Sequence, residues 1–150
     1  MGTLIGFAFV IVFGLTSTMM GCSARQVGTL PDSIERSCAQ GRVFYKIPTD
    51  SATLPYPSVT VTAWHHEENQ PLTETKTDQV GNYCIEVPLG DFRVDLRVWG
   101  MAHSPKTSYT CTGSEDNIDI GTTPNRCGEN CKKIDITAEC KEFTPRRKLP

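Results

Sequence analysis

Cysteine is the residue type with the most chemistry to offer in this sequence, because it occurs seven times in 150 residues. Six of the seven follow one another through the main part of the chain: Cys38, Cys84, Cys111, Cys127, Cys131 and Cys140. An even set in a short secreted chain is typical of a disulfide framework, here of up to three bridges. The spacing contains neither the Cys-x2-Cys pair of a zinc site nor a redox Cys-x-x-Cys motif. We therefore expect disulfides, and we favour pairing Cys38 or Cys84 with the C-terminal strand, and Cys127 or Cys131 with Cys111.

The seventh cysteine, Cys22, follows a segment that looks like an export signal. Residues 1–21 contain no charged side chain, and their apolar run, Leu4 to Leu15, is too short to span a bilayer comfortably. Met19-Met20-Gly21-Cys22 resembles the lipobox of bacterial lipoproteins, which implies removal of residues 1–21 and acylation of Cys22. The resemblance also implies a lipid-anchored protein of the bacterial cell envelope, and Ser23 after the cysteine favours the outer membrane. The alternatives are an ordinary cleaved signal peptide, which would give a secreted protein, and an uncleaved N-terminal anchor.

The densest cluster of metal-ligating residue types is His65-His66-Glu67-Glu68. The spacing from His65 to Glu68 mimics two zinc ligands of the metallocarboxypeptidases, with His103 as a distant third. A catalytic metal would also need a large cleft, which one small all-β domain lacks. We therefore interpret the cluster as a polar strand end, keep His65 and His66 only as weak metal candidates, and expect no catalytic residue and no cofactor.

Two tryptophans, Trp64 and Trp99, are candidates for stacking on sugar rings if they are exposed. Trp64 falls on the face opposite the apolar residues of 59–63. Trp99 breaks the alternation of apolar residues that runs through 92–98. Large aromatic side chains are mostly buried, so we favour packing within or between sheets for both. Carbohydrate binding stays open as the alternative.

Charge excludes one class of partner. The net charge is −2, whereas a nucleic-acid-binding domain shows a basic face. The segment 145–150 carries Arg146, Arg147 and Lys148, which we interpret as a solvated terminus. Contact of this segment with anionic lipid or polysaccharide is a minor alternative.

The elements that must position these residues are short strands. Apolar and polar residues alternate in runs cut by Gly, Pro, Asn and Asp, and no segment has a sustained helical period. The runs predict strands near 41–47, 59–64, 72–77, 83–87, 92–98, 107–112 and 133–140. The fold class they indicate is all-β: a single antiparallel β-sandwich of about seven strands, braced by disulfides.

Two local signals are the clearest. In residues 92–98, Phe92, Val94, Leu96 and Val98 alternate with three charged side chains, which predicts a strand with one buried face. Residues 78–82 predict a tight turn, because Asp78 can bond the backbone ahead of it and Gly81 can adopt a positive φ.

These observations divide the chain into four parts. They are a lipoprotein signal peptide (1–21), a polar tether (22–36), a β-sandwich domain (37–140) and a basic tail (141–150).

The order of motifs from 41 to 98 resembles that of the carboxypeptidase regulatory-like domains. The motifs are Gly41-Arg-Val, Pro57-Ser-Val-Thr-Val, Thr75-Lys-Thr-Asp78, Gly81-Asn-Tyr83, Val87-Pro-Leu-Gly90 and Phe92-Arg-Val. The resemblance implies a prealbumin-like sandwich, an architecture that also occurs among carbohydrate-binding-like folds. It implies an accessory module in which catalysis, where present, belongs to another domain.

The expected function is therefore that of a lipid-anchored, non-catalytic envelope module with a binding or structural role. A carbohydrate-binding module and a subunit of an envelope assembly, bound to other envelope proteins, are the alternatives. A metal-dependent hydrolase is the least favoured.

Overall fold

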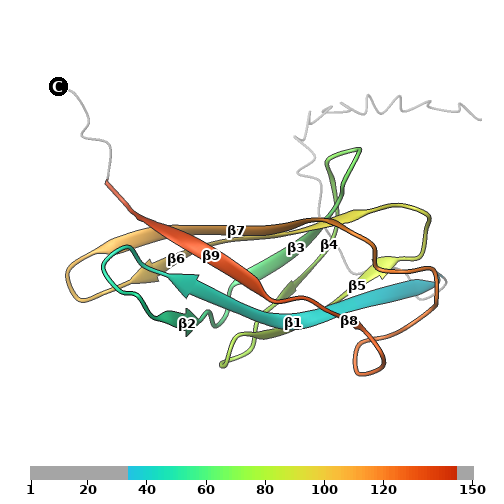
Figure 1. Ribbon diagram of the computed structural model, residues 1–150, viewed down its shortest axis with the longest axis horizontal. Helices are drawn as coiled ribbons and strands as arrows, with labels where there is room; N and C mark the ends of the chain where they lie inside the picture. The colour runs from blue at the N-terminus through green and yellow to red at the C-terminus, as the bar shows by residue number, and fades with distance from the viewer. Residues whose placement is uncertain (1–33, 145–150) are drawn as a thin grey trace, which may run out of the picture.

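A computed structural model describes residues 34–144 of the chain, which are all-β and contain no helix (Figure 1). The strands are β1 Arg36–Lys46, β2 Thr53–Pro55, β3 Thr60–His65, β4 Gln70–Lys76, β5 Asn82–Pro88, β6 Val94–His103, β7 Ser108–Ile118, β8 Lys132–Lys133 and β9 Ile136–Glu142. This part of the chain therefore offers no helix that could cross a membrane. The predicted signal peptide, Cys22 and the residues Arg146, Arg147 and Lys148 of the predicted tail lie outside the described residues.

The strands form one mixed sheet. Its main path has the order β2-β1-β9-β7-β6-β3-β4, and β5 and β8 also pair with β1. The predicted purely antiparallel arrangement is wrong, because β1 runs parallel to both β8 and β9. Parallel neighbours need a crossover connection, and the strandless segment 119–131 carries the chain back to the start of β1 before β8 and β9 follow.

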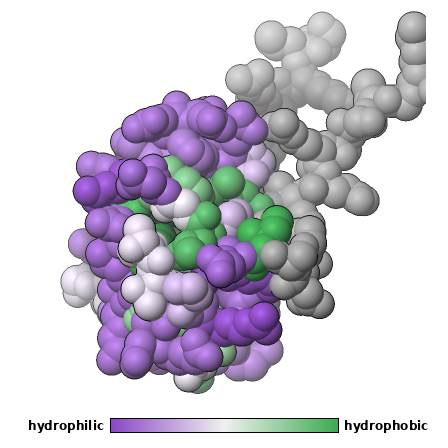
Figure 2. Space-filling model, turned by 90° about the vertical axis from the view of Figure 1, so that its right-hand side faces the viewer, coloured by the Kyte–Doolittle hydropathy of each residue, from purple (hydrophilic) through white to green (hydrophobic). Residues whose placement is uncertain are grey.

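The sheet curls around its core. The first half of β1 pairs with β5 and the second half with β2 and β9, while β4, at the far end of the path, comes into contact with β5. The largest fully buried apolar side chains are Val43, Val61, Ile85, Val87, Val94, Leu96 and Ile136. Viewed from the right-hand end of Figure 1, hydrophobic residues occupy the centre of the surface and hydrophilic residues surround them (Figure 2).

The alternation predicted for residues 92–98 is confirmed from Val94 onward. Val94, Leu96 and Val98 of β6 are buried in the core cluster, and the intervening residues point to the outer face of the sheet. Phe92 precedes the strand and is partly buried against the core. Because β6 lies between β3 and β7, its outer face is flanked by strands on both sides.

The turn at residues 78–82 is also as predicted. The Asp78 carboxylate accepts hydrogen bonds from the backbone N–H groups of Val80 (2.9 Å) and Asn82 (2.8 Å), and Gly81 has a φ of 82°. Tyr83 follows with its ring buried, and its hydroxyl donates to the carbonyl of Ile134 (2.8 Å). The turn thus sets the start of β5 against the segment between β8 and β9.

The six cysteines form three disulfides, as expected, but the favoured pairing is wrong. The bridges are Cys38–Cys131, Cys84–Cys127 and Cys111–Cys140. The C-terminal strand therefore bonds to its antiparallel neighbour β7, where Cys111 and Cys140 are direct cross-strand partners. The other two bridges fasten the segment 119–131 to β1 and β5, because that segment passes beside them on its way back.

Candidate functional site

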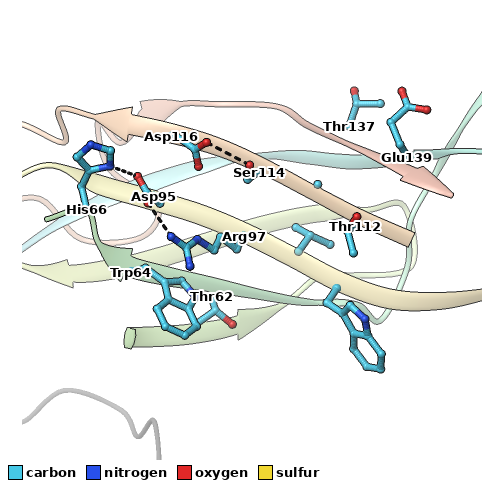
Figure 3. Close-up of a pocket in the computed structure, with 13 residues that line it drawn as sticks. Thr62, Trp64, His66, Asp95, Arg97, Thr112, Ser114, Asp116, Thr137 and Glu139 are labelled. Carbon is cyan, nitrogen blue, oxygen red and sulfur yellow. Dashed lines mark hydrogen bonds and ion pairs between the residues drawn. The ribbon is translucent and has the colours of Figure 1, made fainter. Parts of the chain in front are cut away.

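A groove of about 780 Å³ crosses the outer face of the sheet, over β3, β6, β7 and β9 (Figure 3). Its lining residues are Thr62, Trp64, His66, Asp95, Arg97, Val98, Trp99, Thr112, Gly113, Ser114, Asp116, Thr137 and Glu139. Most of them are the outward members of alternating strands, so the same periodicity that builds the core also presents the groove. A volume of this size lies within the range of small-molecule binding sites.

The base of the groove is organised by Asp95, a carboxylate that is only 3% exposed. Its Oδ1 lies 2.6 Å from His66 Nδ1 and accepts from the backbone N–H of Asn117 (3.0 Å), and its Oδ2 accepts from Arg97 (2.9 Å). Burial by itself disfavours the charged form of Asp95, but these hydrogen bonds and the nearby His66 outweigh it and lower the pKa of Asp95. The carboxylate is therefore held ionised and fixes both neighbouring side chains.

Arg97 is held in place from three sides. Besides Asp95, it donates to the side-chain oxygen of Asn69 (2.9 Å), and its guanidinium carbon lies 4.7 Å from the centre of the Trp64 ring. This is the geometry of a cation–π contact. Arg97 therefore occupies one face of Trp64, and that face is not open to a ligand.

Trp99 is the open aromatic surface of the groove. Its side chain is 65% exposed, so the predicted packing of this residue within or between sheets is wrong. The physical reason is the register of β6, in which Trp99 follows Asp95 and Arg97 on the outer face. Trp64 is half-buried, and the group that packs on its ring is the Arg97 side chain rather than a second sheet.

The β7 and β9 side of the groove carries hydroxyl and carboxylate groups. Ser114 donates to Asp116 (3.4 Å), and Thr112 and Thr137 add further hydroxyls. Within residues 34–144, neither Asp116 nor Glu139 has a cationic partner within ion-pair distance. The groove therefore offers an aromatic platform beside several hydrogen-bonding groups, and the Ser114 hydroxyl is directed to a carboxylate rather than to His66.

The two adjacent histidines are not brought together as metal ligands. His65 stacks on Phe92 (centroids 4.7 Å apart), and its Nδ1 accepts from the backbone N–H of Glu68 (3.2 Å), whereas His66 binds Asp95. His103 lies near Ser108, with 3.0 Å between His103 Nδ1 and Ser108 Oγ. Across the described range, no three His, Cys, Asp or Glu side chains are grouped so as to hold a metal.

Sequence reasoning named Trp64, Trp99 and His66 but missed Asp95 and Arg97 as groove residues. It treated these two as the solvated face of a strand. The sequence did contain a signal for this, because Asp95, Arg97 and Trp99 are alternate residues of one strand and therefore lie on the same face. What the sequence did not contain was the pairing of β3 with β6, which sets Trp64 opposite Asp95.

Comparison of the chain with protein-family models, with curated proteins and with solved structures found no match. An inference about function therefore depends on the groove and the side chains that line it.

Proposed function

We propose that the chain is a non-catalytic carbohydrate-binding module that a lipid on Cys22 holds at the membrane of the cell envelope. The observation that carries the binding role is the exposed indole of Trp99 at the border of a groove lined with hydroxyls and carboxylates. Sugar rings have an apolar face that stacks on an aromatic ring and hydroxyls that need hydrogen-bond partners around it. Trp99 supplies the first, and Thr112, Ser114 and Asp116 supply the second.

The fixed cluster beneath the groove favours binding. Asp95, His66 and Arg97 hold one another, so the hydrogen-bonding groups on this side of the groove need little reordering when a ligand arrives. A preorganised surface loses less entropy on binding than a flexible one.

Replacing Trp99 by alanine is expected to lower affinity for a bound glycan by at least about tenfold, because the stacking surface is removed. The fold should be kept, since the side chain is largely exposed. A glycan array followed by calorimetric titration of the best glycan measures both points. Trp64→Ala should have a smaller effect, because one face of that ring is already covered by Arg97.

Phe143→Ala is the matched control for this test. Phe143 is 48% exposed and aromatic, but it does not line the groove. Equal affinity of the Trp99→Ala variant and the unmodified protein for every glycan bound would refute the proposed site.

The membrane role depends on Met19-Met20-Gly21-Cys22 and is part of the same proposal. Several acyl chains on one cysteine retain a protein at a membrane far better than a single chain does. Cys22→Ala removes the residue that would carry these chains, so the variant is expected to move from the membrane fraction to the soluble fraction. Intact-mass analysis of the membrane fraction, with and without reductant, should show the lipid mass and three disulfides. Membrane retention of the Cys22→Ala protein would contradict lipid anchoring.

We also propose that residues 37–140 form a carboxypeptidase regulatory-like sandwich. The motifs at Gly41, Gly81 and Gly90 support this, as does the curl of the sheet around a core to which β1, β3, β5 and β6 all contribute.

A further inference from the structure

The groove on the outer face of the sheet carries more negative than positive charge. Its charged lining residues are the carboxylates Asp95, Asp116 and Glu139 and the basic side chains Arg97 and His66. The balance is therefore negative even when His66 is protonated. An excess of one sign of charge in a cleft raises the local concentration of ligands of the opposite sign.

The positive charge of the groove is already engaged. Arg97 donates to Asp95 (2.9 Å) and to Asn69 (2.9 Å), and its guanidinium lies over the ring of Trp64. His66 Nδ1 lies 2.6 Å from Asp95. An anionic sugar would have to compete with a buried carboxylate for both basic side chains, so the groove does not favour uronic acids or phosphorylated sugars.

The other two carboxylates lie apart from each other, on the strands beside Trp99. Trp99 pairs in register with Thr112 of β7, and Thr112 pairs with Glu139 of β9, so these three residues form one row on the outer face. Asp116 lies farther along β7, beyond Ser114 (Figure 3). The exposed indole thus has a hydroxyl and then a carboxylate beside it, with a second carboxylate farther along the groove.

The lysines nearest to Glu139 lie outside the groove. Lys46 of β1 is its register partner, and Lys141 follows it on the same face of β9, but neither lysine lines the groove. Among residues 34–144, no cation lies within ion-pair distance of Glu139 or Asp116. A positively charged ligand can therefore pair with both carboxylates without displacing a partner of the protein's own.

We infer that the glycan carries free amino groups, and that an amino sugar stacks on Trp99 with ammonium groups directed to Asp116 and Glu139. This inference rests on the proposed carbohydrate-binding function and adds the charge of the ligand. Trp99 serves both parts of such a ligand, because an indole takes the apolar face of a sugar ring and also attracts a cation.

The test is calorimetric titration of the protein at about pH 6 with tetramers of glucosamine, of N-acetylglucosamine and of glucose. The first carries ammonium groups and the other two are uncharged, while the chain length is the same. At low salt, affinity for the glucosamine tetramer is expected to exceed that for either neutral tetramer by at least about fivefold. The difference should fall below about twofold in about 0.5 M sodium chloride, because salt screens exposed charges.

Glu139→Gln and Asp116→Asn separate the two carboxylates from the rest of the groove. Each is expected to lower affinity for the glucosamine tetramer by about threefold and to leave affinity for the neutral tetramers unchanged, because the amide keeps a hydrogen-bonding oxygen but loses the charge. Glu142→Gln is the matched control, since Glu142 is an exposed carboxylate of the same strand that does not line the groove. It should leave every affinity unchanged.

A tetralysine peptide shows whether charge alone is enough. It has ammonium groups but no sugar ring, so it should bind at least about tenfold more weakly than the glucosamine tetramer. Equal binding of the peptide overturns the inference. So does a glucosamine tetramer that binds no better than the neutral ones, or that binds both carboxylate variants as it binds the unmodified protein. Failure of the protein to bind any of the three sugars contradicts the proposed function itself.

Discussion

Replacing Cys38 and Cys131 together by alanine is expected to lower the free energy of unfolding by about 4–5 kcal/mol. These cysteines lie 93 positions apart, so their bridge closes the longest loop of the three disulfides and removes the most entropy from the unfolded chain. It is also one of the two bridges that fasten the segment 119–131, on which the parallel pairing of β1 with β8 and β9 depends. Equilibrium unfolding in urea measures the change.

The matched control is the double replacement of Cys111 and Cys140, which lie 29 positions apart. All four cysteines are buried, so the cavities left by alanine are similar and the loop length is the main difference. We expect a loss of about 3–4 kcal/mol for this second bridge. A larger loss for Cys111 and Cys140 than for Cys38 and Cys131 would contradict the loop argument.

Both cysteines of a bridge must be replaced in this experiment. The sulfur of Cys131 lies 3.9 Å from that of Cys84, which belongs to the neighbouring bridge. A Cys38→Ala protein would leave a free Cys131 thiol within reach of the Cys84–Cys127 disulfide, and thiol–disulfide exchange would produce a mixture.

Asp95→Ala is expected to lower the free energy of unfolding by about 2–3 kcal/mol, because it leaves the Asn117 N–H without its acceptor and removes the carboxylate that pairs with the Arg97 guanidinium. This value is below that for a fully buried ion pair, since the side chains of Arg97 and His66 are each 38% exposed. The variant should also bind glycan less tightly, because the side chains at the base of the groove lose their shared anchor. Thermal and urea unfolding measure the first effect and calorimetric titration the second.

Asp116→Ala is the control for Asp95→Ala. Asp116 is a carboxylate of the same face, but it is exposed, so its replacement should change the free energy of unfolding by about 0.5 kcal/mol or less. Equal destabilisation by the two replacements would show that the buried cluster does not stabilise the fold.

The pKa of Asp95 gives this prediction a pH dependence. The pKa of Asp95 is lower in the folded protein than in the unfolded chain. The stabilisation that ionised Asp95 provides is therefore complete above the pKa of the unfolded chain, about 3.9, and is lost as the pH falls through the pKa of the folded protein. From about pH 6 to about pH 3 the unmodified protein should therefore lose more stability than Asp95→Asn, which has no charge there to lose. Parallel curves for the two proteins would contradict the lowered pKa.

The local features of this fold could be predicted from the sequence. Alternation in residues 92–98 gave the inner and outer faces of β6, and Asp78 with Gly81 gave the turn before β5. Both depend on residues close together in the chain, whose side-chain direction and backbone freedom are set by period and residue type. The even set of six cysteines likewise indicated disulfides before any pairing was known.

The sequence alone determined that the chain forms strands with one apolar face and that six cysteines are available for bridges. Only the tertiary structure decided that β1 lies parallel to β9, that Cys140 bonds Cys111, and that Trp64, Arg97 and Trp99 share one groove. Alternation specifies which way a side chain points but not which strand lies beside it. That choice depends on contacts between distant segments, such as the passage of Ile134 over Gly41, where no Cβ would fit.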